Sequence, residues 1–157
     1  MSDARFEDGA EQPLRLIAQD ADDLAVLSAL LQDAVFPIIE MTYARKRRRF
    51  ALLVNRFRWE DAVPAERQGR GFERVQSLLV FEDVVAVQTQ GIDRADKSVI
   101  LSVLSVGFTP GEDGMGRLDL TLAGDGMIGL TVEALNVSLR DVTRPYLAPS
   151  QHMPTHE

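Results

Sequence analysis

The side chains with the most capacity for binding chemistry lie in one short run, Arg56-Phe57-Arg58-Trp59-Glu60-Asp61. A guanidinium group matches carboxylate and phosphate with two parallel N–H donors, and arginine and tryptophan often anchor protein interfaces. Two interpretations follow. Arg56, Arg58, Trp59 and Glu60 form a binding surface, or they end a structural hairpin. In the second, which is favoured, Trp59 lies in the core while Arg56 and Arg58 pair with acids on a neighbouring strand.

Five consecutive cations, Arg45 to Arg49, precede this cluster. Such a run can contact the phosphates of nucleic acid or anionic lipid, or it can be the solvated tip of a hairpin. The acidic balance of the chain, with a net charge of −7, and the lack of interleaved aromatic residues argue against nucleic acid. Successive strand residues alternate faces, so only some of these cations, such as Arg45, Arg47 and Arg49, can share one side. Arg70, between two glycines, completes the candidate binding residues.

The common catalytic motifs are missing from the sequence. There is no cysteine, and both histidines, His152 and His156, lie in a proline-rich C-terminal tail. No Gly-x-Ser-x-Gly, P-loop or dinucleotide-binding motif occurs. The adjacent acids Glu60-Asp61, Glu82-Asp83 and Glu112-Asp113 fall at expected strand ends or loops, where carboxylates stay solvated and ionised. We therefore assign no catalytic residue, metal ligand or cofactor, and a binding protein is favoured over an enzyme.

Charge is distributed unevenly along the 157 residues. Residues 45–74 hold ten of the seventeen Lys and Arg side chains and four acidic ones, a net charge of +6, between two acidic segments. A chain of this length is most simply one domain, with a core that needs no metal or disulfide. No apolar run approaches the ~20 residues of a membrane-spanning helix, and no signal peptide is recognised. The missing apolar run predicts a protein that does not enter a membrane. The absence of cysteine fits a reducing compartment, and we expect a cytoplasmic protein.

A long β-hairpin is expected to hold the cationic residues. Its strands are Phe36–Tyr43 and Phe50–Trp59, joined by the basic run. Side chains of the second strand alternate with period 2, the period of a strand. One face would carry Ala51, Leu53, Asn55, Phe57 and Trp59, and the other Phe50, Leu52, Val54, Arg56 and Arg58. Glu60–Gly71, which contains one proline and two glycines, is expected to be a surface loop.

One helix is expected, over about residues 21–35. Asp20 suits its N-cap, and leucines at helical spacing give it one apolar face. The other expected strands are Leu14–Ala18, Phe72–Phe81, Val84–Gln90, Lys97–Phe108, Arg117–Leu122 and Met127–Leu139. Hairpins would link Phe72–Phe81 to Val84–Gln90 and Arg117–Leu122 to Met127–Leu139. A phase slip at Ala134-Leu135 is typical of a β-bulge, and a short helix over Glu133–Val142 is the alternative.

These elements predict a mainly β (α+β) fold. About eight antiparallel strands would curl into a partly open barrel resembling the pleckstrin-homology type, with the N-terminal helix over a mouth or edge. A two-layer α+β sandwich is the alternative. We expect an acidic disordered segment at 1–12, a single globular domain at 13–146 and a proline-rich disordered tail at 147–157.

The run from Arg48 to Glu60, RRFALLVNRFRWE, resembles the central signature of a small bacterial family catalogued as domain of unknown function 2948. The stretches Leu120–Gly124, Val132–Leu135 and Leu139–Val142 also resemble the pattern of that family. The resemblance spans about residues 14–146. The family has no assigned activity, so the resemblance implies no catalytic or binding residue.

The leading hypothesis is a cytoplasmic binding or assembly module that engages an acidic protein partner or another copy of itself. Its candidate surface comprises Arg45, Arg47, Arg49, Arg56, Arg58, Trp59, Glu60 and Arg70, with the segment Glu60–Gly71. The first alternative is a small enzyme or a binder of an anionic small molecule. It would use a barrel-mouth pocket where Arg56, Arg58 and Glu60 meet the ligand. Nucleic-acid binding through residues 45–49 is a weaker alternative.

Overall fold

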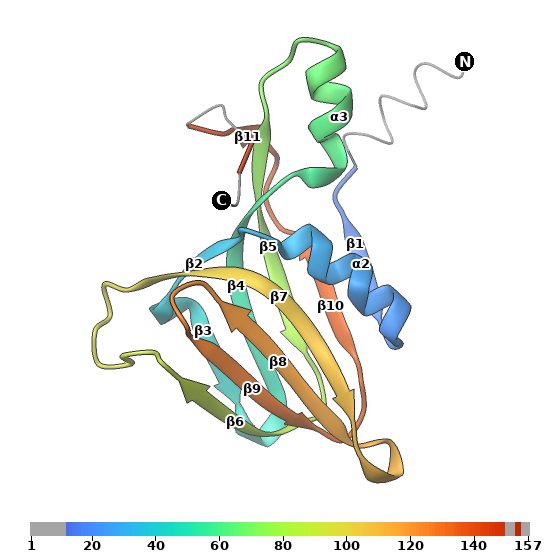
Figure 1. The fold of residues 1–157 in the computed structure, drawn as a ribbon, viewed down its shortest axis with the longest axis vertical. Coiled ribbons are helices and arrows are strands. Elements are labelled where there is room, and N and C mark those ends of the chain that lie inside the picture. Colours follow the sequence, from blue (N-terminus) through green and yellow to red (C-terminus); the bar gives the residue numbers. More distant parts are fainter. Residues whose placement is uncertain (1–11, 150–152, 155–157) are drawn as a thin grey trace.

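The computed structural model describes residues 12–149 and 153–154, most of which belong to antiparallel β-structure (Figure 1). The acidic segment expected at 1–12 and much of the tail expected at 147–157 lie outside the described residues. The helices of the described part are α2 (Ala21–Leu31) and α3 (Trp59–Arg67), with the short 3-10 helices η1 (Ile38–Glu40), η2 (Arg45–Arg47) and η3 (Glu112–Gly114). The strands are β1 (Arg15–Ala18), β2 (Val35–Pro37), β3 (Met41–Ala44), β4 (Arg49–Phe57), β5 (Glu73–Phe81), β6 (Val84–Gln90), β7 (Ile100–Pro110), β8 (Gly116–Leu122), β9 (Met127–Val132), β10 (Val137–Asp141) and β11 (Tyr146–Leu147).

The strands form one sheet that curls round without closing. Its order is β1-β10-β5-β4-β2-β7-β8-β9-β6, with β3 added to β4 and β11 added to β5. The short strand β2 pairs with β4 on one side and with β7 on the other, and so joins the two halves. Figure 1 shows β6, β7, β8 and β9 in front of β4, β5 and β10.

These findings confirm the mainly antiparallel β architecture. The expected counts of about eight strands and one helix were wrong, because the described residues form eleven strands and two helices. The sheet is open, and the likeness to a pleckstrin-homology barrel is not confirmed.

One hydrophobic cluster fills the inside of the curled sheet. Phe50, Leu52 and Val54 of β4 belong to it and are at most 3% exposed. Leucines of β8 and apolar residues of β9 contribute from the facing half: Leu118, Leu120, Leu122, Ile128, Leu130 and Val132. Arg56 continues the buried face of β4, while the intervening residues Ala51, Leu53 and Asn55 are half-buried. The alternation predicted for β4 is therefore confirmed, and it directs a guanidinium group inward.

The expected hairpin is shorter than its two apolar runs. Only β3 of the first run pairs with β4, from Met41 opposite Leu52 to Ala44 opposite Arg49. Upstream, Pro37 ends β2 beside Ile100 of β7, and η1 separates it from β3. Proline has no N–H to donate to a ladder, so the run cannot continue as one regular strand.

Helix α2 begins where the sequence predicts. The carboxylate of Asp20 accepts a hydrogen bond from the N–H of Asp23 at 2.8 Å, and Leu24, Leu27 and Leu31 are buried. The helix ends at Leu31, earlier than the predicted residue 35. Beyond it the chain takes a left-handed conformation at Asp33, with φ of 65°, and enters β2.

Two connections differ from the predictions: the expected hairpin from β5 to β6, and the segment Glu133–Val142. β5 and β6 do not pair with each other: β5 pairs with β4, β10 and β11, whereas β6 pairs with β9. The tight link Glu82-Asp83, with φ of 58° at Asp83, carries the chain to the other half of the sheet. The segment Glu133–Val142 is neither a bulged strand nor a helix, because β9 ends at Val132 and β10 begins at Val137 on the opposite half.

The two crossings lie side by side. The N–H of Glu82 donates to the carbonyl of Asn136 at 3.0 Å, and the N–H of Glu133 donates to the carbonyl of Asp83 at 2.9 Å. Sequence pattern alone could not separate a crossing from a tight turn, because both need the same short polar link. The β8–β9 hairpin with its turn at Gly124-Asp125 is confirmed.

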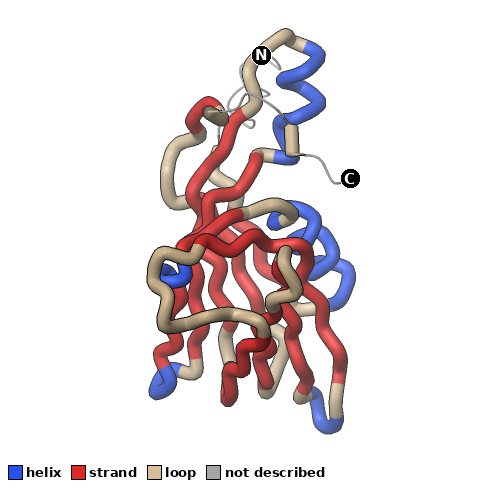
Figure 2. The backbone as a smooth tube through the Cα atoms, turned by 60° about the vertical axis from the view of Figure 1, so that its left-hand side comes forward, coloured by secondary structure: helices blue, strands red, loops and turns tan. Residues whose placement is uncertain are grey.

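The surface loop expected at Glu60–Gly71 is wrong, because most of it forms α3. Glu60 and Asp61 lie in the first turn, where the helix dipole favours acids. The helix ends in a Schellman motif. Gly69, with φ of 65°, donates to Glu66, and Arg70 donates to the carbonyl of Ala65 at 2.8 Å. Figures 1 and 2 show α3 standing at one end of the molecule, beyond α2.

The chain stays ordered beyond the expected domain boundary at residue 146. In β11, Tyr146 pairs with Arg74 and Leu147 pairs with Glu73, and Ala148 is buried. The first residues of the expected tail therefore belong to the sheet.

Candidate functional site

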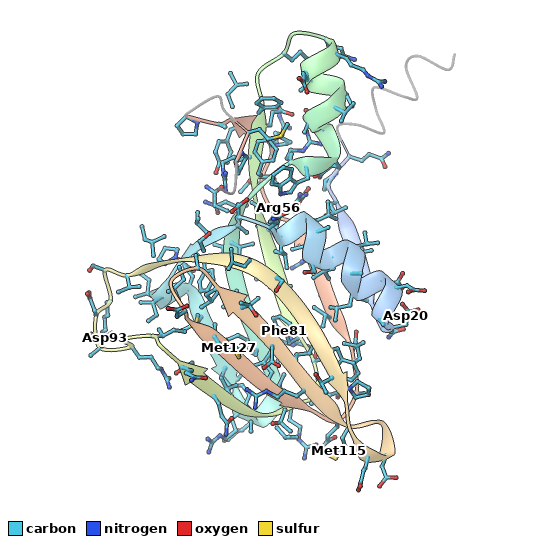
Figure 3. The ribbon with its side chains drawn as sticks, in the orientation of Figure 1. Asp20, Arg56, Phe81, Asp93, Met115 and Met127 are labelled. Atoms are coloured by element: carbon cyan, nitrogen blue, oxygen red, sulfur yellow. The ribbon has the colours of Figure 1, made fainter. Side chains whose placement is uncertain are left out.

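Arg56 is the centre of a buried polar network below α3, where Figure 3 labels it. Its side chain has no exposed surface. Nη1 and Nη2 donate to the two carboxylate oxygens of Glu60 at 2.9 and 2.7 Å. Nη2 also donates to Oδ1 of Asp141 at 2.9 Å, and Nε donates to the hydroxyl of Ser77 at 3.0 Å. We call Arg56, Glu60, Ser77 and Asp141 the Arg56 network.

Asp141 extends this network to the N-terminal strand. It accepts hydrogen bonds from the hydroxyl of Ser77 at 2.7 Å and from the N–H of Leu14 at 2.9 Å. Its own N–H donates to the carbonyl of Leu14. Burial alone would lower the pKa of Arg56, but the hydrogen bonds and charges of Glu60 and Asp141 outweigh it and raise that pKa above its usual value. The network therefore joins β4, β5, β10 and α3 through hydrogen bonds and ion pairs centred on the Arg56 guanidinium group.

Arg58 and Arg70 also bind acids of their own chain. Arg58 donates to Glu73 at 2.6 Å and lies 3.7 Å from Asp61. Arg70 contacts both carboxylate oxygens of Asp61, at 3.1 and 3.2 Å. The hydrogen bond to Asp61 raises the pKa of Arg70. Both arginines thus fix α3 and the segment that follows it.

Trp59 opens α3 instead of continuing the strand. Its indole N–H donates to the carbonyl of Gln32, just beyond the end of α2, at 2.9 Å. Its ring meets Phe57 edge-on with centroids 4.6 Å apart, and Phe57 in turn packs on Phe72. Trp59 is half-buried and connects the two helices.

The basic hairpin tip divides into paired and unpaired cations. Arg48, in a left-handed conformation after η2, pairs with Glu133, and Arg49 pairs with Glu82 at 2.8 Å. Arg45, Lys46 and Arg47 are exposed and form no ion pair with any residue that the structure describes. The predicted candidates therefore fall into two separate places. Arg45, Arg47 and Arg49 lie at the hairpin tip, and Arg56, Arg58, Trp59, Glu60 and Arg70 lie around α3.

Sequence reasoning missed a groove beside the hairpin tip, with a volume of about 450 Å³. Its lining includes Ile38, Ile39 and Met41 from η1 and β3, and Val85, Ala86 and Val87 from β6. We call it the β3–β6 groove. It lies between two strands that do not pair with each other, and is therefore the opening left by the unclosed sheet.

Three cations line this groove: Arg45 from the hairpin, and Arg94 and Lys97 from the connection between β6 and β7. All three are exposed, and none forms an ion pair within the described part of the chain. The acids nearest in sequence make local bonds, since Asp93 accepts from the N–H of Ala95 and Asp96 accepts from Ser98. Figure 3 labels Asp93 in this connection, at the margin of the molecule. No local sequence signal could have linked Arg94 to the hairpin, because only the curl of the sheet brings the two together.

The groove continues along the last residues of β6. A second hollow of about 500 Å³ shares Thr89 and Arg94 with it and extends over Gln90, Met127 and Gly129. The two hollows together follow most of the length of β6.

No group of three or more His, Asp or Glu side chains in the described ranges is placed to hold a metal ion. None of the described helices is long and apolar enough to span a membrane.

Comparisons with known proteins give the family. No curated protein and no solved structure matches this chain. One family model matches residues 14–156, nearly the whole chain, and agrees with the resemblance noted in the sequence. The chain belongs to the family described as "Protein of unknown function (DUF2948)".

Proposed function

We propose that this protein is a binding module for an acidic segment of a partner protein, which it receives at the β3–β6 groove and the adjoining hairpin tip. One observation carries the proposal: Arg45, Arg94 and Lys97 line one groove beside apolar side chains, without an ion-pair partner among the described residues. Cations in this state steer an oppositely charged partner and orient it. The apolar lining supplies surface whose burial then stabilises the complex.

The proposal moves the working surface away from the residues around α3. Arg56, Arg58 and Arg70 are engaged with Glu60, Asp141, Glu73 and Asp61. Withdrawing Arg56 would leave the buried Asp141 without a cationic partner. We therefore assign them to support of the fold, and keep Arg45 and Arg47 as binding residues. A cytoplasmic location stays part of this proposal.

A second candidate is an anionic small molecule with an apolar portion, bound in the same groove. The volume of about 450 Å³ favours it, because small-molecule pockets usually measure roughly 300–1,000 Å³. The predicted pocket at Arg56, Arg58 and Glu60 does not serve this candidate, since these side chains bind each other. Nucleic acid is less well supported, because Arg48 and Arg49 pair with acids and leave a small cationic patch on an acidic chain.

The proposal is tested by selecting random phage-displayed peptides on the full chain, with counter-selection on the double variant Arg94→Glu/Lys97→Glu. We expect the recovered peptides to combine acidic residues with a large apolar residue. In fluorescence anisotropy, the double variant should weaken their binding by about tenfold or more. Sodium octanoate and inorganic phosphate, titrated in parallel, test the small-molecule candidate.

The matched control is Arg15→Glu/Arg140→Glu. These two exposed arginines lie opposite each other in β1 and β10, at the far end of the sheet order. Their reversal changes the net charge equally, so it separates a local effect from a general one. Peptides that bind both double variants equally well, or that lack acidic residues, would refute the proposal. Binding of octanoate with no selected peptide would assign the groove to the second candidate.

A further inference from the structure

Strand β6 is an edge strand, and one of its two sides has no strand partner among the described residues. It stands last in the sheet order, and its ladder partner in the described part of the chain is β9. In an edge strand, alternate residues direct their N–H and C=O groups away from the sheet. On β6 these groups face the β3–β6 groove.

The lining of the groove shows that it follows this edge and not one face of the strand. Val85, Ala86 and Val87 are consecutive, and all three line the groove. The register shift between Val84 and Ala86 interrupts the alternation of faces at Val85. Ala86 and Val87 follow this shift, point to opposite faces and both line the groove, which therefore runs along the strand margin. The other wall of the groove contains β3, which pairs with β4 and is also an edge strand.

The groove is closed at one end only. The N–H of Val84 donates to the carbonyl of Arg48 at 2.8 Å, and the hydroxyl of Tyr43 donates to the carbonyl of Val84 at 2.9 Å. These bonds join β6 to the hairpin at its first residue. From Val85 onward no strand pairing bridges the gap between β3 and β6 in the described residues.

Edge strands are usually guarded by lysine, proline, inward-pointing charge or a β-bulge. The register of β6 against β9 shifts between Val84 and Ala86, but from Ala86 to Gln90 the pairing is regular and the strand has none of these guards. Its sequence is VVAVQTQ, seven residues without charge or proline. By contrast β1, at the other end of the sheet order, has four residues and begins with Arg15. An unguarded edge beside an apolar groove is a template for an added strand.

Building on the proposed function, we infer that the acidic partner segment binds as an extended strand added to the free edge of β6. Its backbone pairs with β6, and a large apolar side chain enters the groove between Met41 and Val87. Arg45 near the start of the groove and Arg94 near its far end receive carboxylates. The segment therefore carries acids on both sides of an apolar residue.

The charges around the groove select this occupant. Arg45, Arg94 and Lys97 repel a basic segment, and the adjoining Lys46 and Arg47 add to the same sign. An extended chain uses the backbone groups of β6, whereas a helix or a compact anion leaves them unpaired.

The test uses the tightest peptide recovered in the selection above, synthesised in two N-methylated forms that block either the odd or the even backbone N–H groups. An added strand donates from every second residue. We therefore expect one form to lose about 100-fold in affinity and the other to change less than about threefold. Hydrogen exchange of the full chain by NMR should show new protection at alternate amides of β6 and no change in β1.

The outcomes separate the two proposals. If both N-methylated forms bind like the parent while Arg94→Glu/Lys97→Glu still weakens binding, the strand-addition inference is overturned and the proposed function stands. If no charge-dependent peptide is recovered, the proposed function itself fails. The amides of β6 could instead become protected from hydrogen exchange without peptide, as the protein concentration rises. This result would assign the edge to a second copy of the chain and would overturn the partner segment as its occupant.

Discussion

The Arg56 network permits a quantitative prediction about the stability of the fold. Arg56 is fully buried and Asp141 is 4% exposed, so neither charge has water to replace a lost partner. Removing one member of a buried ion pair costs about 3–5 kcal/mol, because the other charge stays buried without compensation. We expect Arg56→Met to destabilise the protein by this amount, since Asp141 would keep only the donors Ser77 and Leu14.

Asp141→Leu should cost a similar amount for a different reason. Arg56 would retain Glu60, which is 30% exposed, but the hydroxyl of Ser77 and the N–H of Leu14 would both lose their acceptor. The double variant Arg56→Met/Asp141→Leu replaces both charges by apolar groups. It should therefore be less destabilised than the sum of the single variants, with a coupling of about 1–3 kcal/mol.

Equilibrium unfolding in urea, followed by far-UV circular dichroism and by the fluorescence of Trp59, measures these free energies. Arg140→Met is the matched control: Arg140 is exposed, adjoins Asp141 in sequence, and should change the stability by less than about 0.5 kcal/mol. The reasoning is refuted if Arg56→Met costs less than about 1 kcal/mol, or if the two single effects add without coupling.

Three further predictions follow from local geometry. Asp20→Ala removes the N-cap of α2 and should cost about 1 kcal/mol in urea unfolding, while Asp20→Asn should restore most of it. Gly69→Val should cost about 1–2 kcal/mol, because Gly69 has φ of 65° and no atom near its Cβ position, so the cost is backbone strain alone; an unchanged stability would contradict the Schellman assignment. Hydrogen bonds from the Ser98 hydroxyl and N–H lower the pKa of Asp96 in the folded chain. Asp96 therefore stabilises the fold above its ordinary pKa, and this stability is lost as the pH falls through the lower pKa of the folded state. Ser98→Ala should raise the pKa of Asp96, which carboxyl ¹³C NMR measures.

Local patterns predicted the elements whose signals are complete within a few residues. Asp20 and the leucines after it gave α2, the alternation from Phe50 to Val54 gave β4, and Gly124-Asp125 gave the β8–β9 turn. The helix α3 was missed because Pro64 was read as a loop residue, although the helix contains it. Its signals were present: two acids in the first turn and Gly69 just past the end.

Pairing between distant strands was predicted less well, for a physical reason. A short polar link between two apolar strands can form a hairpin or can carry the chain to the other half of the sheet. Which of the two forms depends on the strands with which each apolar run pairs in the folded core. Glu82-Asp83 and the segment after Val132 are both crossings, and they are held together by the hydrogen bonds between them. Neither could be recognised from its own residues, because each connection is stabilised by the other.

The groove follows from the same crossings. Because β6 pairs with β9 and not with β5, the sheet ends at β6, and the gap opposite β3 remains. The crossing also brings the connection that carries Arg94 and Lys97 to Arg45. The basic segment 45–74 is thereby sorted into two groups. Its buried arginines are neutralised by acids around α3, whereas the cations at the hairpin tip gain further cations as neighbours. Like charges gathered without counter-charge repel each other and oppose folding, so a bound acidic segment would stabilise the folded chain by the free energy of its binding.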